Sequence, residues 1–139
     1  MGNFMTTRTR NSKHGLFDRR ILSKGGHGKD AACFVTKIDL QAAVDEYTST
    51  KTPLDTIAAQ TYGFPIGNRC VSDIDNFDEL FKDKEFINEN INGWDMSKAT
   101  STRFMFLDAK EFNQPLDRWN MAQVQDMTGM FSDAESFHQ

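Results

Sequence analysis

The stretch "FNQPLDRWNM", residues 112–121, alternates turn-forming residues with large apolar ones. Pro115 and Asp117 are typical of turns, because they favour backbone conformations that interrupt helices and strands. Trp119 and Met121 are large apolar residues that favour burial. The combination predicts that the stretch is one unit of a repeat, in which polar turns alternate with core positions.

The chain repeats itself at an offset of 25 residues. Aligning 87–114 with 112–139 gives nine identical positions out of 28. The matched residues of the first segment are Asn88, Trp94, Met96, Met105, Phe106, Asp108, Ala109, Phe112 and Gln114. The same offset extends one step earlier, so we expect three repeats, at 62–86, 87–111 and 112–136, and the start of a fourth at Phe137.

Within each repeat, the spacing of the apolar residues changes once, from every second residue to steps of three and four. Leu116, Trp119 and Met121 end in an alternation of period two, which predicts a short strand with one buried face. The apolar positions that follow step by three and four, as on one face of a short helix: Val124, Met127, Met130 and Phe131. One strand and one short helix per repeat predict an α/β solenoid, because each unit can be covered only by the next copy.

The segment "INGWDMSKATSTRFMFLDAKEFNQPLDRWNMAQVQDMTGMFSDAESFHQ", residues 91–139, resembles the BspA-like leucine-rich-repeat family, also called mycoplasma lipoprotein-associated repeats. That family's pattern runs W-D-V-S-x-V-T-x-M-x-x-M-F-x-x-A-x-x-F-N-Q-x-L. The resemblance implies a leucine-rich-repeat-like solenoid used at cell surfaces for adhesion or protein binding, without catalytic residues or cofactors. The expected partner is therefore a protein or a surface glycan.

The chain departs from the family pattern in its earlier part. Arg69 occupies the position of Trp94 and Trp119, which predicts that the first repeat is half exposed, and Thr102 replaces an expected Met. A standard leucine-rich repeat also has a buried ladder of Asn three residues after the strand. Those positions hold Ile74, Ala99 and Val124, so we expect no such ladder.

The net charge of −4 is unevenly distributed. Residues 1–30 hold seven Lys or Arg and two Asp, a net charge of +5, whereas the other 109 residues hold nine basic and eighteen acidic residues, a net charge of −9. Residues 1–32 have few apolar positions and predict a disordered basic arm. The acidic body disfavours a nucleic-acid partner.

The first residues, "MGNFMT", match the N-myristoylation pattern with Gly2 as the acceptor. An acyl chain and the basic arm together could hold the chain on an anionic membrane, so an alternative function is a membrane-peripheral adaptor. An unmodified, flexible basic tail is the competing interpretation.

Residues 33–61 predict a helical cap over the first repeat. One helix is expected at 36–47, with Val35, Ile38 and Ala42 in its buried stripe, which Leu40 and Val44 could extend. A second helix is expected at 52–63, where Thr52 can cap the first turn. The third repeat has no such cover, which suggests a truncated array and possible self-association through its open face.

Cys33 and Cys70 lie in different segments without metal-ligand spacing. Because the first residues lack the apolar core of an export signal, we expect free buried thiols, with a disulfide as the alternative. For the same reason we expect a chain in the cytoplasm or on the cytoplasmic face of a membrane. The family resemblance indicates the cell surface instead. No apolar run approaches the ~20 residues needed to cross a bilayer.

The candidate binding site is the outward face of the predicted strands: Asp95 and Ser97, then Asn120 and Ala122, with Cys70 and Ser72 in the first repeat. Solenoids align such positions into one surface. Three aspartates recur once per repeat and are expected to form turns, with a calcium ladder as the alternative: Asp83, Asp108 and Asp133. No histidine lies near a nucleophile at a recognisable spacing, so we expect no catalytic residues, and no metal or cofactor is expected.

Overall fold

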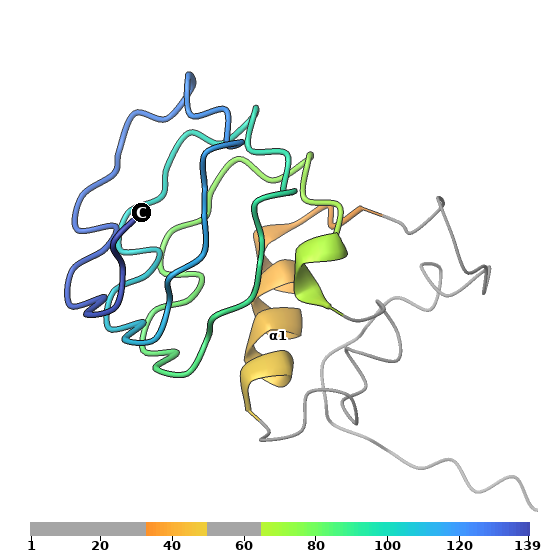
Figure 1. Cartoon of the computed structure of the whole chain (residues 1–139). Helices are drawn as coiled ribbons and strands as arrows, with labels where there is room; N and C mark the ends of the chain where they lie inside the picture. Colours follow the sequence, from red (N-terminus) through yellow and green to blue (C-terminus); the bar gives the residue numbers. More distant parts are fainter. Residues whose placement is uncertain (1–32, 50–64) are drawn as a thin grey trace, which may run out of the picture.

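The computed structural model describes residues 33–49 and 65–139 of the chain (Figure 1). These residues contain one α-helix, α1 (Lys37–Thr48), and one 3-10 helix, η3 (Ile66–Asn68). The chain then winds through coils that lie against one another, which we call coil 1 (65–86), coil 2 (87–111) and coil 3 (112–136). The arm predicted at 1–32 and the helix predicted at 52–63 lie outside the described residues.

The predicted fold class, an α/β leucine-rich-repeat-like solenoid with a strand and a short helix in each repeat, is wrong. Past Asn68 the described chain forms neither a helix nor a sheet, and its β-structure is limited to two isolated parallel bridges, Asn76–Ser101 and Ser101–Asp126. The stretch predicted as a strand contains a tight turn, closed by the bond from the Trp119 N–H to the Leu116 carbonyl at 3.1 Å. Each coil is therefore a series of turns.

Positive backbone φ angles explain why no helix forms. The described residues with φ between 54° and 60° are Glu79, Asp83, Phe104, Asp108, Gly129 and Asp133. They supply two left-handed positions per coil, four residues apart, and an α-helix with φ near −63° cannot pass through either. The three- and four-residue apolar spacing comes instead from turns such as Met127–Met130, whose N–H to carbonyl distance is 3.2 Å.

Hydrogen bonds between neighbouring coils use every second residue. The N–H groups of Phe77, Glu79, Phe81 and Asp83 donate to the carbonyls of Ser101, Arg103, Met105 and Leu107, each at 2.9 Å. The N–H groups of Thr102, Phe104, Phe106 and Asp108 donate in the same way to Asp126, Thr128, Met130 and Ser132 at 2.8–3.0 Å. The intervening N–H groups close turns within their own coil, as Leu80 does onto Phe77. This alternation satisfies the buried backbone without a sheet.

Aromatic rings stack through the core at the 25-residue offset. The ring of Phe106 lies 5.3 Å from that of Phe81 and 5.3 Å from that of Phe131. Trp94 and Trp119 are buried as predicted, and the indole N–H of each donates to a carbonyl of the preceding coil, Ile66 at 3.2 Å and Ile91 at 3.0 Å. Met127, predicted to be in the core, is 52% exposed.

Helix α1 packs against coil 1, as the predicted cap requires (Figure 1). Thr36 caps it, accepting a bond from the Asp39 N–H at 3.1 Å. The buried residues are Leu40, Ala43, Val44 and Tyr47. The stripe predicted from Val35 and Ile38 is wrong, since these side chains are 69% and 80% exposed. The helix presents the adjacent face, on which residue 40 is followed at helical spacing by 43, 44 and 47.

Arg69 in place of a tryptophan predicted that the first repeat is half exposed, and this prediction is wrong. Arg69 is 9% exposed, and Ile66, Val71 and Ile74 beside it are buried. Tyr47 of α1 is buried near Arg69, and burial, followed by a hydrogen bond to Glu89, raises the pKa of its phenol above the usual value. The helix thus covers the surface that the missing tryptophan would otherwise leave open.

Candidate binding surface

The predicted binding residues lie at one corner of the coils. Each corner is a tight turn closed by an N–H to carbonyl bond, from Ile74 to Val71, from Ala99 to Met96 and from Val124 to Met121, at 2.9–3.1 Å. We call the aligned residues 70–74, 95–99 and 120–124 the corner column. Asp95, Asn120 and Ala122 in it are exposed and Ser97 is half-buried. The structure therefore brings all four predicted residues onto one edge.

Two of these residues also hold the corner in shape. The Asp95 carboxylate accepts a bond from the Ser97 N–H at 3.0 Å, and the Asn120 side-chain oxygen accepts one from the Ala122 N–H at 3.1 Å. The side-chain and backbone hydrogen bonds from Ser97 lower the pKa of Asp95 below its usual value. Because such turns fix the backbone locally, these side chains position the surface as well as contribute to it.

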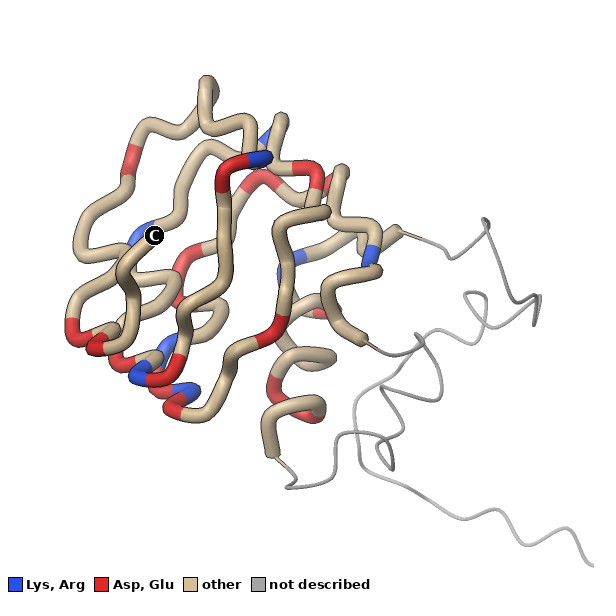
Figure 2. The backbone as a smooth tube through the Cα atoms, in the orientation of Figure 1, with Lys and Arg blue, Asp and Glu red and all other residues tan. Residues whose placement is uncertain are grey.

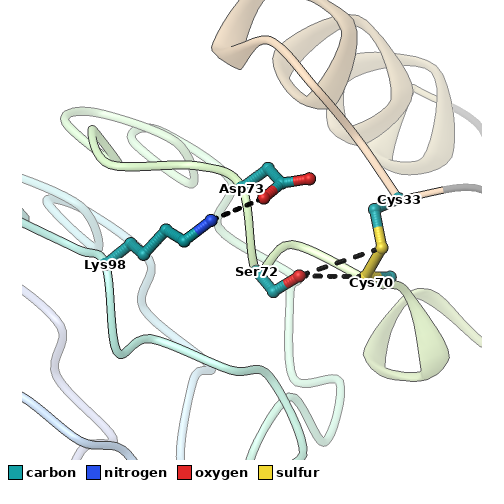
Figure 3. The surroundings of a disulfide bond; sticks show 5 residues. All are labelled: Cys33, Cys70, Ser72, Asp73 and Lys98. Carbon is teal, nitrogen blue, oxygen red and sulfur yellow. Dashed lines mark hydrogen bonds and ion pairs between the residues drawn. A yellow bond between two sulfur atoms is a disulfide. The ribbon is translucent and has the colours of Figure 1, made fainter.

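The first corner contains a disulfide between Cys33 and Cys70, so the prediction of free thiols is wrong (Figure 3). The Ser72 hydroxyl lies 3.3 Å from the Cys70 sulfur and 3.8 Å from that of Cys33. The Phe34 N–H donates to the Cys70 carbonyl at 3.0 Å, which holds the two segments side by side. The 37-residue separation of the cysteines does not reveal this contact.

An ion pair that the sequence analysis missed joins two corners. The Lys98 ammonium lies 2.7 Å from the Asp73 carboxylate, across the gap between coils 1 and 2 (Figure 3). The hydrogen bond to Asp73 raises the pKa of Lys98. The two residues are 25 positions apart, which equals the repeat offset, so this pair could have been predicted from the sequence.

A different, solvent-exposed asparagine ladder links the coils at other positions. The positions of the buried ladder in standard leucine-rich repeats, among them Ile74 and Ala99, hold buried apolar residues. Asn88 instead accepts bonds from the Asn113 N–H at 2.9 Å and the Gln114 side chain at 3.0 Å. Asn113 accepts equivalent bonds, at 3.2 Å from the His138 N–H and 3.0 Å from the side chain of Gln139. The repeated Asn and Gln of the self-alignment mark this ladder.

The aspartate column has the turn role that was predicted. Asp83, Asp108 and Asp133 have φ of 57–60°, a conformation that Asp tolerates better than most residues. In the described ranges no group of three or more His, Cys, Asp or Glu side chains could hold a metal ion. Acidic residues outnumber basic ones along the coils (Figure 2).

A groove of about 840 Å³ lies between α1 and coil 1. Its lining is charged and apolar: Lys37, Ile38, Gln41, Ala42, Asp45, Asp78, Glu79, Lys82, Asp83 and Lys84. Lys84 and Asp45 form an ion pair of 2.8 Å inside it. No Ser, Cys or His contributes to this lining.

Within residues 33–49 and 65–139, no helix is long and apolar enough to span a bilayer. The proposed lipidation site, Gly2, lies outside these ranges.

Comparison with known proteins gives one match. A family model described as "Mycoplasma protein of unknown function, DUF285" matches residues 54–139, which is more than half of the chain. No match was found among curated proteins or among solved structures.

Proposed function

The chain belongs to the DUF285 family, and on that premise we propose that it is a noncatalytic repeat scaffold of the BspA-like kind. Its binding surface is the corner column, and its partner is a protein located at the cell surface. The family itself carries no assigned function, so the proposal rests on the geometry of this chain.

The observation that carries the proposal is a constant backbone bearing variable side chains. The corner turn has the same hydrogen bond in all three coils. Its exposed positions differ, however, as with Asp73, Lys98 and Gln123, which align at one position of the turn. A scaffold that holds its fold constant while varying one exposed edge is suited to binding, because the edge can change without disturbing the core.

The disulfide supports a location outside the cytoplasm. Disulfides persist in oxidising compartments and are rare where glutathione keeps thiols reduced. The Cys33–Cys70 bond therefore favours the surface scaffold over the adaptor anchored through Gly2, which would lie on the reducing side of a membrane.

The test is affinity capture with the full, oxidised chain from a detergent extract of cell-surface proteins, quantified by mass spectrometry. The Ala122→Arg variant adds a long cation to the corner column, and Ile38→Arg adds the same charge on α1, where the side chain is 80% exposed. We expect one or a few proteins to be retained by the native chain and by Ile38→Arg, and lost with Ala122→Arg. Equal retention by all three, or no specific retention, would contradict the proposal.

A further inference from the structure

Asn92 and Gly93 form the only Asn-Gly pair of the sequence, and they occupy a turn of coil 2. The turn is closed by the bond from the Trp94 N–H to the Ile91 carbonyl at 3.0 Å. Gly93 is exposed and Asn92 is half-buried. An Asn followed by Gly is prone to spontaneous deamidation, because Gly has no side chain to hinder the attack of its backbone nitrogen on the Asn side chain. The pair is therefore a candidate modification site.

The reaction has two steps, and water is the only other reactant. The backbone nitrogen of Gly93 attacks Cγ of Asn92, and the Cγ–Nδ2 bond breaks. The departing nitrogen takes up the proton that the Gly93 nitrogen loses and leaves as ammonia, so that a succinimide ring remains. Water then opens the ring at one of its two carbonyl carbons, which gives either aspartate or isoaspartate. Both products carry a carboxylate in place of a neutral amide, and isoaspartate also adds one carbon atom to the backbone.

Coil 3 holds the Asn92 side chain in place. The side-chain nitrogen of Asn92 donates to the Asp117 carboxylate at 2.7 Å, and its side-chain oxygen accepts a bond from the Arg118 N–H at 3.0 Å. Because a backbone N–H can only donate, the second bond fixes which end of the amide is the oxygen. Ring closure has to draw Cγ onto the nitrogen of Gly93 in its own turn, which moves the amide away from coil 3 and breaks both bonds. The contact between coils 2 and 3 therefore opposes the reaction.

A carboxylate at residue 92 would repel coil 3 where the amide attracts it. Asn92 and Asp117 occupy the same position of neighbouring coils, 25 residues apart. Deamidation removes the donor that Asp117 uses, and it places a second carboxylate at hydrogen-bond distance from the first. Two carboxylates that share a site cannot both ionise without strong repulsion. The stabilising bond thus becomes a destabilising contact.

Isoaspartate would also disturb a buried contact. The carbonyl of Ile91, next to the modified residue, accepts the bond from the indole N–H of Trp119 at 3.0 Å. Trp119 is a buried side chain of coil 3. An extra backbone atom at residue 92 displaces the turn that carries this carbonyl. Both products therefore loosen the same contact between coils 2 and 3.

We propose that Asn92–Gly93 is a deamidation site that coil 3 keeps closed, and that it reacts when coil 3 is displaced from coil 2. The product disfavours the return of coil 3, so that a transient opening becomes permanent. Coil 3 carries residues 120–124 of the corner column, and the reaction would mark chains in which this part of the column has come apart. The proposal does not depend on what the corner column binds.

The first test measures the deamidation rate of the full, oxidised chain at mildly alkaline pH, by peptide mapping with mass spectrometry that separates the two products. Asp117→Ala removes the charged acceptor at an exposed position, and the rate should rise about tenfold, equal to about 1.4 kcal/mol, the order of one hydrogen bond to a charged group. Asp73→Ala is the matched control. It removes an equally short contact of 2.7 Å, to Lys98, between coils 1 and 2, and should leave the rate unchanged.

Two further samples identify the site and the protection. Unfolding the native chain in urea should raise the rate by a larger factor than Asp117→Ala does. Gly93→Ala should suppress the reaction even in urea. This variant should still fold, because the added Cβ would meet only the Gly67 carbonyl oxygen, at 3.9 Å.

The second test follows the consequence of the reaction. Asn92→Asp should lower the urea midpoint by about 0.7 M, which is a tenfold change in the folding equilibrium at a slope of about 2 kcal/mol/M. Asn120→Asp makes the same change of charge in coil 3 and should leave the midpoint unchanged, since the equivalent Asp95 accepts the same turn bond. The purified isoaspartate form should show a shifted indole N–H signal of Trp119 in its NMR spectrum.

Three results would overturn the proposal. One is an equal deamidation rate in the native chain and in Asp117→Ala. Another is a native rate as fast as the rate in urea, which would mean that coil 3 gives no protection. The third is a urea midpoint that Asn92→Asp leaves unchanged.

Discussion

Loss of the Cys33–Cys70 disulfide is expected to destabilise the native chain strongly. The bond closes a loop across 37 residues of sequence and ties α1 to coil 1. In the chain-entropy model, a loop of that length contributes about 4 kcal/mol to the free energy of unfolding. Because small domains have a total stability of roughly 5–15 kcal/mol, the double substitution Cys33→Ala and Cys70→Ala removes a large share.

Urea denaturation followed by tryptophan fluorescence measures this loss. With a dependence on urea of about 2 kcal/mol/M, the midpoint should fall by about 2 M. Ser72→Ala is the matched control: it removes the hydroxyl that lies 3.3 Å from the Cys70 sulfur but keeps the disulfide, and its midpoint should change little. Native protein whose thiols react with iodoacetamide, or a midpoint unchanged by the double substitution, would refute the reasoning.

Three further predictions follow from the core, a turn and a corner. Phe106→Ala should lower the free energy of unfolding by about 3–5 kcal/mol, because it removes the middle ring of the stacked column. The control Phe86→Ala, at a 79% exposed site, should change the free energy of unfolding by less than about 0.5 kcal/mol. Urea midpoints measure both changes. Gly129→Ala should destabilise the chain by at least about 1 kcal/mol, because φ is +57° and the added Cβ would clash with the Phe104 ring. An unchanged melting temperature would count against the turn geometry. The pKa of Asp95 is lowered in the folded chain, so its contribution to stability is present above the unfolded-state pKa of 3.8 and is lost as pH falls through the lower folded-state pKa. Carboxyl titration by NMR should place the Asp95 pKa below 3.8, and a pKa at or above 3.8 would exclude the corner hydrogen bonds.

The stacking of the chain at a 25-residue offset could be predicted, because self-alignment detects a period regardless of the local backbone. The local structure could not be predicted from apolar spacing alone. Steps of three and four arise from an α-helix or from consecutive four-residue turns. The difference is set by left-handed residues such as Asp108 and Phe104. Asp108 signals such a position weakly, and Phe104 gives no signal at all.

The corner residues could be placed because positions 25 apart align in any such stack. Their local role was missed, since the hydrogen bond of Asp95 to Ser97 depends on the turn itself. The disulfide was missed for another reason. Cys33 reaches Cys70 only because the segment before α1 runs beside coil 1, a contact that the spacing of the two cysteines does not encode.

Amide hydrogen exchange, resolved by NMR for the native chain, tests the stacked-coil structure most directly. The account predicts slow exchange at the N–H groups that cross between coils, including Phe81 and Phe106. It predicts fast exchange at Gly129 and Phe131, whose N–H groups have no acceptor among the described residues. A short helix in each repeat would instead protect consecutive amides through 127–131 of coil 3. Continuous protection there, or equal exchange at Phe106 and Phe131, would contradict the account.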